Sequence, residues 1–345
     1  MYTSIQFLRA VAALGVVLFH GFFLLQPFVP IDSWLVGFIH RGYVGVDVFF
    51  VISGFVATLS VEKYLKSGRS GLGFLINRAL RIYLGYWPFY FLALVLAIAT
   101  NSAARMDWDL VKSFFLWFLI GRDQGKILVL YVSWSLAYEL IFYLFVASVM
   151  FHLGRKMMVI FAAVISLLLF CFSFFPGAKG DSAFVLISFF GEFLLGCLCY
   201  SLASTSHFSS VFKAILALFS ISFGLYVGLS FDADIGPLRF FGFGSFSFGL
   251  VLFFVILEKG WGIVFNQFLV ALGNASYTIY LCHTLIFEIS QYFSANISLD
   301  YRWVVESSVW AMLVLLSIVS FSILYFRCVE RPIYRGVTAF FRLQE

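Results

Sequence analysis

The stretch MMVIFAAVISLLLFCFSFF at residues 157–175 decides the class of fold. It contains no Asp, Glu, Lys, Arg or His, and a run of about 18 or more apolar residues predicts a helix that crosses a membrane. Its apolar residues are continuous, whereas the strands of a membrane β-barrel alternate apolar and polar residues. The stretch therefore predicts an α-helical membrane protein.

The composition of the whole chain agrees with this stretch. Of 345 residues, 63% are hydrophobic and 11% are charged, and the mean hydropathy is +1.02. A soluble domain has roughly 45–50% apolar and about 25% charged residues, so a water-soluble globule, a disordered chain and a nucleic-acid-binding protein are excluded. The five cysteines lie in or at the ends of apolar segments without metal-binding spacing, so we expect no disulfide framework and no metal.

Ten apolar segments predict about ten transmembrane helices in a single bundle. No internal repeat, Gly/Ser linker or low-complexity segment divides the chain, so we expect one all-α domain over residues 1–345 with no added soluble domain. The predicted helices are 5–27, 42–61, 82–99, 131–151, 157–175, 184–201, 211–229, 240–257, 268–290 and 303–326.

The segment LVKSFFLWFLIG at 110–121 is too short and too polar for a further span. Without it, the ten spans place both termini on one side, together with 14 of the 22 basic residues. Basic residues concentrate in cytoplasmic loops, so we expect both termini in the cytoplasm. The segment 110–121 then forms a short helix that lies on the outer face or re-enters it.

Four of the predicted helices carry titratable residues at a similar depth, in the outer third of the membrane: His20, Asp47, Glu139 and His283. Ionisable side chains within a membrane are energetically costly, and each one is a hypothesis for a functional site. Chance would scatter such residues over different depths, so their agreement predicts one shared site.

The cytoplasmic edge carries guanidinium groups instead. Arg9 lies at the inner end of the first predicted helix, and Arg78 and Arg81 are three residues apart, so they share a helix face. Planar guanidinium groups bind phosphates through paired hydrogen bonds. These three arginines therefore predict an anion site, although each could also be a simple interfacial anchor.

Arg9 and His20 are related by helical geometry. Eleven residues turn a helix through almost three whole turns, so both side chains lie on one face. At 1.5 Å per residue their Cα atoms are about 16 Å apart, a distance on the order of an extended pantetheine arm. A carrier held by its phosphates at Arg9 would thus deliver a thioester to His20, which suggests group transfer across the bilayer.

Six short segments, distributed over almost the whole chain, form a specific set. They are IQFLRAVAALGVVLFH (5–20), GYVGVDVFFVISGF (42–55), NRALRIY (77–83), SWSLAYELIFY (133–143), SYTIYLCH (276–283) and VERP (329–332). In this order they resemble the acyltransferase-3 family of integral membrane acyltransferases. Members of that family O-acylate lipopolysaccharide O-antigens, exopolysaccharides, nodulation factors and macrolides.

The resemblance implies an O-acyltransferase of the bacterial inner membrane. Arg9 and His20 match the essential pair of the family, and acetyl-coenzyme A is its usual donor. The implied partners are acyl-coenzyme A, a glycan or glycolipid acceptor and membrane lipid. Tyr277 and His283 lie in the SYTIYLCH segment, where we expect substrate binding, although a structural role for His283 stays open.

Each candidate residue has an expected role. His20 would be the general base for an acceptor hydroxyl, with a covalent acyl-histidine relay as the other mechanism. Glu139 would either orient His20, as a carboxylate does behind a catalytic imidazole, or bind acceptor hydroxyls. Asp47 is a third catalytic candidate, but a carboxylate at the start of a helix is also stabilised by the helix dipole.

A transporter or flippase of a polar lipid-linked sugar is the alternative function. Such a protein would use the same buried charges as a permeation path. Inverted repeats and paired broken helices are typical of transporters, and the sequence indicates neither.

Overall fold

The protein is a bundle of membrane-length helices. The computed structural model describes residues 2–30, 33–99, 108–116, 129–173, 182–231, 233–296 and 308–341, and these residues contain helices and no strand. Within them, nine helical segments are long and apolar enough to cross a membrane, and the number rises to ten if two further helices, bent by 69°, are counted as one broken span. The predicted all-α membrane fold is confirmed.

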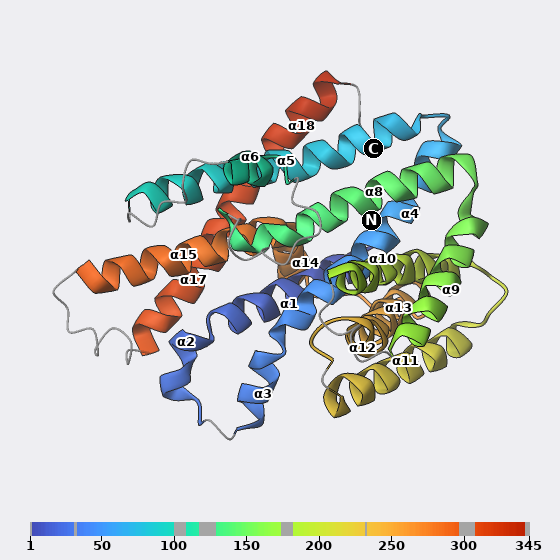
Figure 1. Cartoon of the computed structure of the whole chain (residues 1–345), viewed down its shortest axis with the longest axis horizontal. Helices are drawn as coiled ribbons and strands as arrows, with labels where there is room; N and C mark the ends of the chain where they lie inside the picture. Colours follow the sequence, from blue (N-terminus) through green and yellow to red (C-terminus); the bar gives the residue numbers. More distant parts are fainter. Residues whose placement is uncertain are drawn as a thin grey trace.

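Each predicted span overlaps one long helix of the structure (Figure 1). The long helices are α1 (Thr3–His20), α4 (Gly45–Lys66), α5 (Gly71–Ala99), α8 (Trp134–His152), α9 (Arg155–Phe172), α10 (Ser182–Ser204), α11 (Ser210–Ser230), α13 (Ser245–Lys259), α15 (Ser276–Asn296) and α17 (Ser308–Tyr325). Shorter helices are α2 (Phe22–Leu25), α3 (Trp34–His40), α6 (Trp108–Phe114), α12 (Pro237–Arg239), α14 (Gln267–Asn274) and α18 (Arg331–Phe340).

Two of the boundaries that differ from the prediction involve charged residues. Helix α5 begins at Gly71, so Arg78 and Arg81 lie inside the helix rather than before it. Helix α17 continues through the π-helical residues Phe326–Glu330 into α18. In both places the charged residues lower the local hydropathy, although a helix does not have to end where the apolar residues end.

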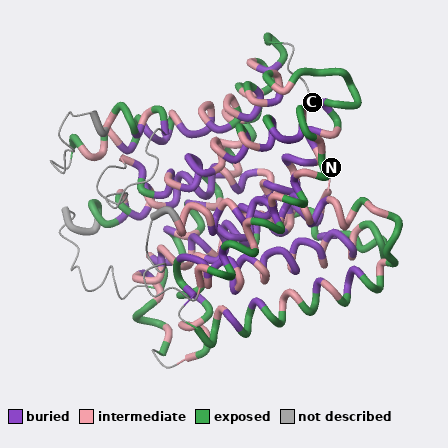
Figure 2. The backbone as a smooth tube through the Cα atoms, turned by 45° about the vertical axis from the view of Figure 1, so that its right-hand side comes forward, coloured by how far each residue is buried: buried purple, intermediate pink, exposed green. Residues whose placement is uncertain are grey.

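Helix α1 lies in the middle of the bundle. It packs against α4, α13, α14 and α15, and Figure 2 shows buried backbone in the centre of the molecule and exposed backbone on its rim. Rim helices such as α9 and α11 carry many exposed large apolar side chains, as expected of surfaces that face lipid. A polar residue on α1 can therefore be shielded from lipid on several sides.

Close backbone contacts hold the centre of the bundle together. A Cβ atom added to Gly54 of α4 would lie 1.9 Å from the carbonyl oxygen of Phe193, and one added to Gly196 of α10 would lie 2.1 Å from that of Val51. Small residues let membrane helices approach in this way. Any larger side chain at Gly54 or Gly196 would force α4 and α10 apart.

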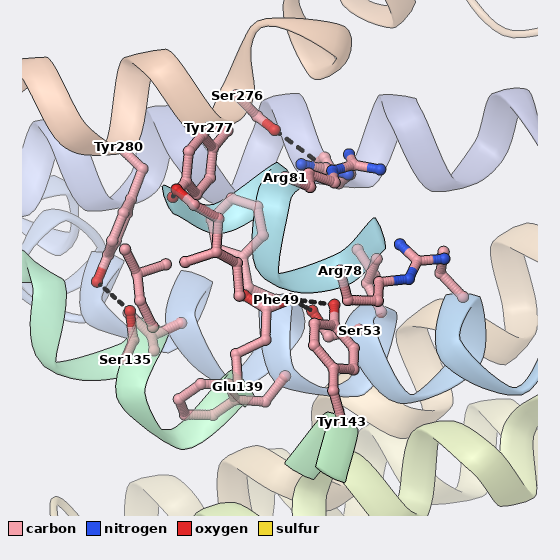
Figure 3. Close-up of a pocket in the computed structure, with 17 residues that line it drawn as sticks. Phe49, Ser53, Arg78, Arg81, Ser135, Glu139, Tyr143, Ser276, Tyr277 and Tyr280 are labelled. Carbon is pink, nitrogen blue, oxygen red and sulfur yellow. Dashed lines mark hydrogen bonds between the residues drawn. The ribbon is translucent and has the colours of Figure 1, made fainter. Parts of the chain in front are cut away.

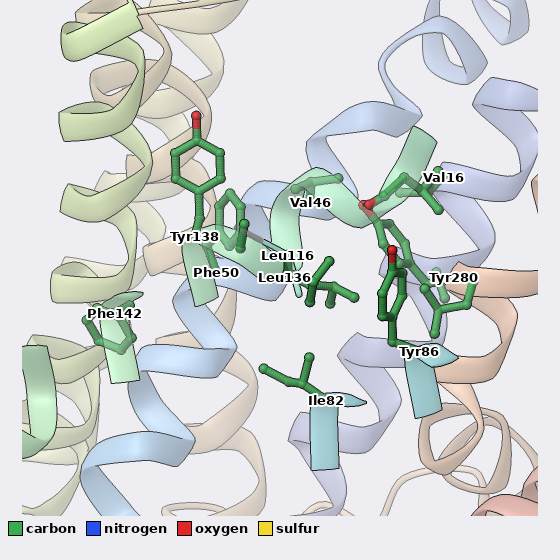
Figure 4. Packing of buried hydrophobic residues seen from close by; sticks show 14 of the residues in the cluster. Val16, Val46, Phe50, Ile82, Tyr86, Leu116, Leu136, Tyr138, Phe142 and Tyr280 are labelled. Carbon is green, nitrogen blue, oxygen red and sulfur yellow. The ribbon is translucent and has the colours of Figure 1, made fainter. Parts of the chain in front are cut away.

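Aromatic rings fill the space beside this contact (Figure 4). Figure 4 labels Phe50 and Phe142 among these rings. The ring of Phe50 lies 4.6 Å from that of Phe193, and the ring of Phe142 stacks on that of Phe193 at 4.3 Å. Phe142 and Phe193 are fully buried, and Phe50 nearly so. This packing joins α4, α8 and α10, and it fixes the wall of the site described below.

The described part of the segment 110–121 is a short helix that enters the bundle, whereas residues 117–121 lie outside the described residues. Ser113 and Leu116 are buried, which favours the re-entrant alternative. Backbone carbonyls at a helix end lack partners within the helix, and at membrane depth the protein must supply them. Side chains of α5 donate to these carbonyls: Tyr83 to Phe115, Tyr86 to Ser113, Trp87 to Phe114 and Tyr90 to Leu110.

Candidate active site

A pocket between α1, α4, α5, α8 and α15 gathers five of the eight predicted site residues: Arg9, Arg78, Arg81, Glu139 and Tyr277. The space between its lining residues, open solvent at the mouth included, is about 780 Å³. Figure 3 shows the arginines on one side of the pocket and a tyrosine–serine pair on the other.

The arginine side of the pocket is strongly cationic. Arg9 Nε donates a hydrogen bond to Ser276 Oγ at 3.0 Å, beside the bend between α14 and α15. Arg78 is buried and donates a hydrogen bond to Ser60. Its guanidinium lies 5.6 Å from the centre of the Tyr143 ring. Arg9 and Arg81 also repel each other electrostatically, and a bound anion would offset that repulsion.

A carboxylate that the sequence analysis did not single out completes this side. Glu330, in the segment VERP, accepts a hydrogen bond from Thr278 and interacts with both Arg9 and Arg81. It is a local countercharge for two arginines that come from other helices. Its sequence position, in a motif next to a π-helical turn, was the available signal.

Glu139 belongs to this pocket rather than to His20. Its Oε1 atom accepts hydrogen bonds from Ser53, at 2.9 Å, and from Tyr143. The ring of His20 contacts another histidine, so of the two roles expected for Glu139 this placement favours binding of acceptor hydroxyls over orientation of His20. The spacing of Glu139 and Tyr143, four residues apart on one helix, was the sequence signal for their contact.

The far side of the pocket is lined by tyrosines of α15. The hydroxyl of Tyr277 donates a hydrogen bond to the carbonyl oxygen of Ile82, 2.8 Å away, and so links α15 to α5. Tyr280 was not singled out from the sequence. Its hydroxyl lies 2.9 Å from Ser135 Oγ and donates to the carbonyl oxygen of Val132.

His20 and His283 form a pair next to this tyrosine side. His20 Nδ1 lies 3.1 Å from His283 Nε2, and His283 Nδ1 lies 3.1 Å from the carbonyl oxygen of Ile279. The ring of Tyr280 lies 6.0 Å from that of His283, which connects the pair to the pocket wall. His283 is fully buried and both of its ring nitrogens are engaged, an arrangement that agrees with the structural role left open from the sequence.

Asp47 lies in a different environment from the histidines. Its two oxygens accept hydrogen bonds from Arg239 Nε at 2.9 Å and from Nη2 at 2.7 Å, and its side chain is fully buried. The rings of Tyr43 and Phe189 lie 5.0 and 5.1 Å from that guanidinium. The structure therefore places Asp47 in an ion pair with Arg239, whereas the ring of His20 contacts His283.

In the described part of the chain, no group of three or more His, Cys, Asp or Glu residues is arranged to hold a metal ion. Three arginines line one side of the pocket, and the histidine pair lies next to the other side.

These features define a multi-pass membrane protein with a buried cationic pocket and a nearby pair of imidazoles. The chain belongs to the acyltransferase 3 family, because the family model described as an acyltransferase domain matches residues 2–327.

Curated relatives of the chain carry related names. The chain is 26% identical to O-acetyltransferase OatA of Staphylococcus aureus (strain NCTC 8325 / PS 47) over 373 residues, covering 96% of this chain and 57% of that protein. It is 27% identical over 315 residues to a protein of strain COL provisionally named O-acetyltransferase SACOL0978, covering 80% and 49%. The chain thus spans about half the length of these relatives. No solved structure matches the chain significantly.

Proposed function

We propose that the protein is an O-acyltransferase that moves an acetyl group from cytoplasmic acetyl-coenzyme A to a hydroxyl of a glycan or glycolipid at the outer side of the bacterial inner membrane. One observation carries this proposal: a single pocket has three arginines at one side and, at the other, Tyr280, whose ring lies 6.0 Å from that of His283 in the His20–His283 pair. The names of the O-acetyltransferase relatives support the choice of an acetyl group.

The arginine side suits the donor. Coenzyme A carries its phosphates at one end and its thioester at the other. Arg9, Arg78 and Arg81 would bind the phosphates through charge-assisted hydrogen bonds, which are roughly twice as strong as neutral ones. With both termini in the cytoplasm, as the charge bias predicts, this side of the pocket opens toward the cytoplasmic supply of acetyl-coenzyme A.

The middle of the pocket suits the arm of the donor. Its lining there is largely apolar and includes Val46, Phe49, Ile82 and Leu136. Helix α1 is continuous from Thr3 to His20, so Arg9 and His20 are separated by about 16 Å along it. An extended pantetheine arm would cover that distance and bring its thioester to the histidine pair.

His20 would act as the general base. As the acceptor hydroxyl oxygen bonds to the thioester carbonyl carbon, its proton passes to His20, and the carbon–sulfur bond then breaks. The departing thiolate of coenzyme A takes the proton back from His20, so the reaction needs no further reactant. General base catalysis contributes typically about 10²–10⁴-fold, and positioning of the two substrates adds to it.

Acetyl transfer in proteoliposomes tests the proposal. Purified protein is supplied with radiolabelled acetyl-coenzyme A and a bacterial envelope glycolipid fraction, and label is followed into the glycolipid. We expect protein-dependent labelling and release of free coenzyme A. Movement of the glycolipids across the bilayer without consumption of acetyl-coenzyme A would instead support the flippase alternative.

A further inference from the structure

The His20–His283 contact is part of a hydrogen-bond chain with a defined direction. The carbonyl oxygen of Ile279, 3.1 Å from His283 Nδ1, can only accept a hydrogen bond. Nδ1 of His283 must therefore carry the proton and donate. In a neutral imidazole the other nitrogen is then an acceptor, so His283 Nε2 presents a lone pair to His20.

The direction of this hydrogen-bond chain sets the tautomer of His20. Its Nδ1 atom, 3.1 Å from His283 Nε2, must supply the hydrogen between them. Neutral His20 thus holds its hydrogen on Nδ1, and its Nε2 atom keeps a free lone pair.

The reverse direction would require a charged His283. A doubly protonated His283 could donate from Nε2, but its side chain is fully buried, with the rings of Tyr280 and Phe287 both 6.0 Å from its own ring. An ionised group in such a membrane interior is costly unless a countercharge accompanies it. The neutral chain of donors and acceptors is therefore favoured.

We propose that His283 is a positioning residue that holds His20 as the Nδ1-protonated tautomer, so that Nε2 of His20 is the atom that takes the acceptor proton. This inference rests on the proposed function of His20 as a base. In a serine-protease triad, an aspartate holds the catalytic histidine in the required tautomer. Here the neutral imidazole of His283, bonded to the carbonyl oxygen of Ile279, has that role. When Nε2 of His20 gains the proton, the Nδ1–H group of His20 donates a stronger hydrogen bond to His283 Nε2. The hydrogen-bond chain thereby stabilises the imidazolium form of His20.

Two substitutions at position 283 separate this role from simple packing. His283→Phe keeps a ring but removes the acceptor, and we expect kcat to fall by about 10–100-fold, less than the ~10⁴-fold loss on altering the charged aspartate of a triad. The KM for acetyl-coenzyme A should stay unchanged, because the arginines are intact. His283→Gln places an amide oxygen near the position of Nε2, and it should restore most of kcat.

The matched control is His207→Phe, which changes an exposed histidine in the α10–α11 connection and should leave kcat and KM unchanged. Monodispersity and thermal unfolding of each variant show whether it is folded. Wild-type kcat in His283→Phe would overturn the inference, and so would a loss in His283→Gln as deep as that in His283→Phe.

Nitrogen-15 NMR gives a readout that does not depend on activity. In a variant in which His40, His152 and His207 are replaced by Gln, only His20 and His283 remain. We expect a protonated Nδ1 and an unprotonated Nε2 on His20, and loss of this preference after His283→Phe. An Nε2-protonated His20 would refute the inference even in an active enzyme. Failure of the wild-type protein to transfer acetyl would instead refute the proposed function.

Discussion

At the scale of single residues, the site separates binding from proton transfer. Arg9 and His20 lie on one helix, yet their contacts differ: Arg9 bonds to Ser276 and His20 to His283. Both partners belong to α15, so α1 and α15 together hold the two groups apart. A change at one end of α1 should therefore leave the function of the other end intact.

Arg9 gives the prediction for the binding end. Replacing Arg9 with Ala removes a charge-assisted phosphate contact of about 1.5–3 kcal/mol, so the affinity for coenzyme A should fall at least about tenfold. Isothermal titration of purified protein with coenzyme A measures this. The control is Arg41→Ala, because the exposed Arg41 bonds to the carbonyl of Gly37 outside the arginine pocket. Equal affinities in wild type and Arg9→Ala would make Arg9 an interfacial anchor.

At the scale of helices, the ion pair of Asp47 and Arg239 joins the start of α4 to α12. Both side chains are buried, and Glu192 of α10 lies near enough to interact with both. No described donor bonds to either oxygen of Glu192. The pair thus ties the start of α4 to α12, and Asp47 rather than Glu192 is the acid that bonds to Arg239.

Stability measurements distinguish these two acids. Asp47→Ala leaves a buried guanidinium without its hydrogen-bonded partner, and breaking a buried pair in this way costs about 3–5 kcal/mol. Thermal unfolding in detergent should show a large fall in Tm, whereas Glu192→Gln should change Tm little. If Glu192→Gln were the more destabilising of the two, Glu192 rather than Asp47 would be the partner that holds Arg239.

Helix-level features differ in how far the sequence predicts them. The spans follow from local hydropathy, and the common face of Arg9 and His20 follows from their spacing. The partners do not follow, because Asp47 and Arg239 are 192 positions apart and His20 and His283 are 263 apart. Spacing defines the face of a helix but not which helix lies opposite, so Glu139 was expected beside His20 although it bonds to Ser53 and Tyr143.

At the scale of the whole molecule, the bundle places a cationic pocket on one side and the histidine pair toward the other. This arrangement has a direction only if the chain has a fixed orientation in the membrane. The basic residues favour a cytoplasmic arginine side through the positive-inside rule. The orientation is therefore a prediction on which the proposed path of the acetyl group depends.

Labelling of introduced cysteines tests the orientation. In a protein whose exposed Cys171 and Cys328 are replaced by Ser, an impermeant maleimide should label Gln26→Cys in intact cells. Ser67→Cys, in the turn between α4 and α5, should react only after the cells are permeabilised. The opposite pattern would place the arginines on the outer side and would contradict delivery of acetyl-coenzyme A from the cytoplasm.

The central claim is that coenzyme binding and proton transfer occupy separate places, the arginine side of the pocket and the His20–His283 pair next to its tyrosine side. Acetyl transfer and coenzyme A affinity, measured on the same preparation of His20→Gln, test it most directly. Glutamine can form hydrogen bonds but cannot take a proton near neutral pH, so turnover should fall by about 10² or more while the affinity for coenzyme A stays that of the wild type. A His20→Gln protein that retains most of the wild-type rate would contradict the account, and a folded one that no longer binds coenzyme A would contradict the separation of the two places.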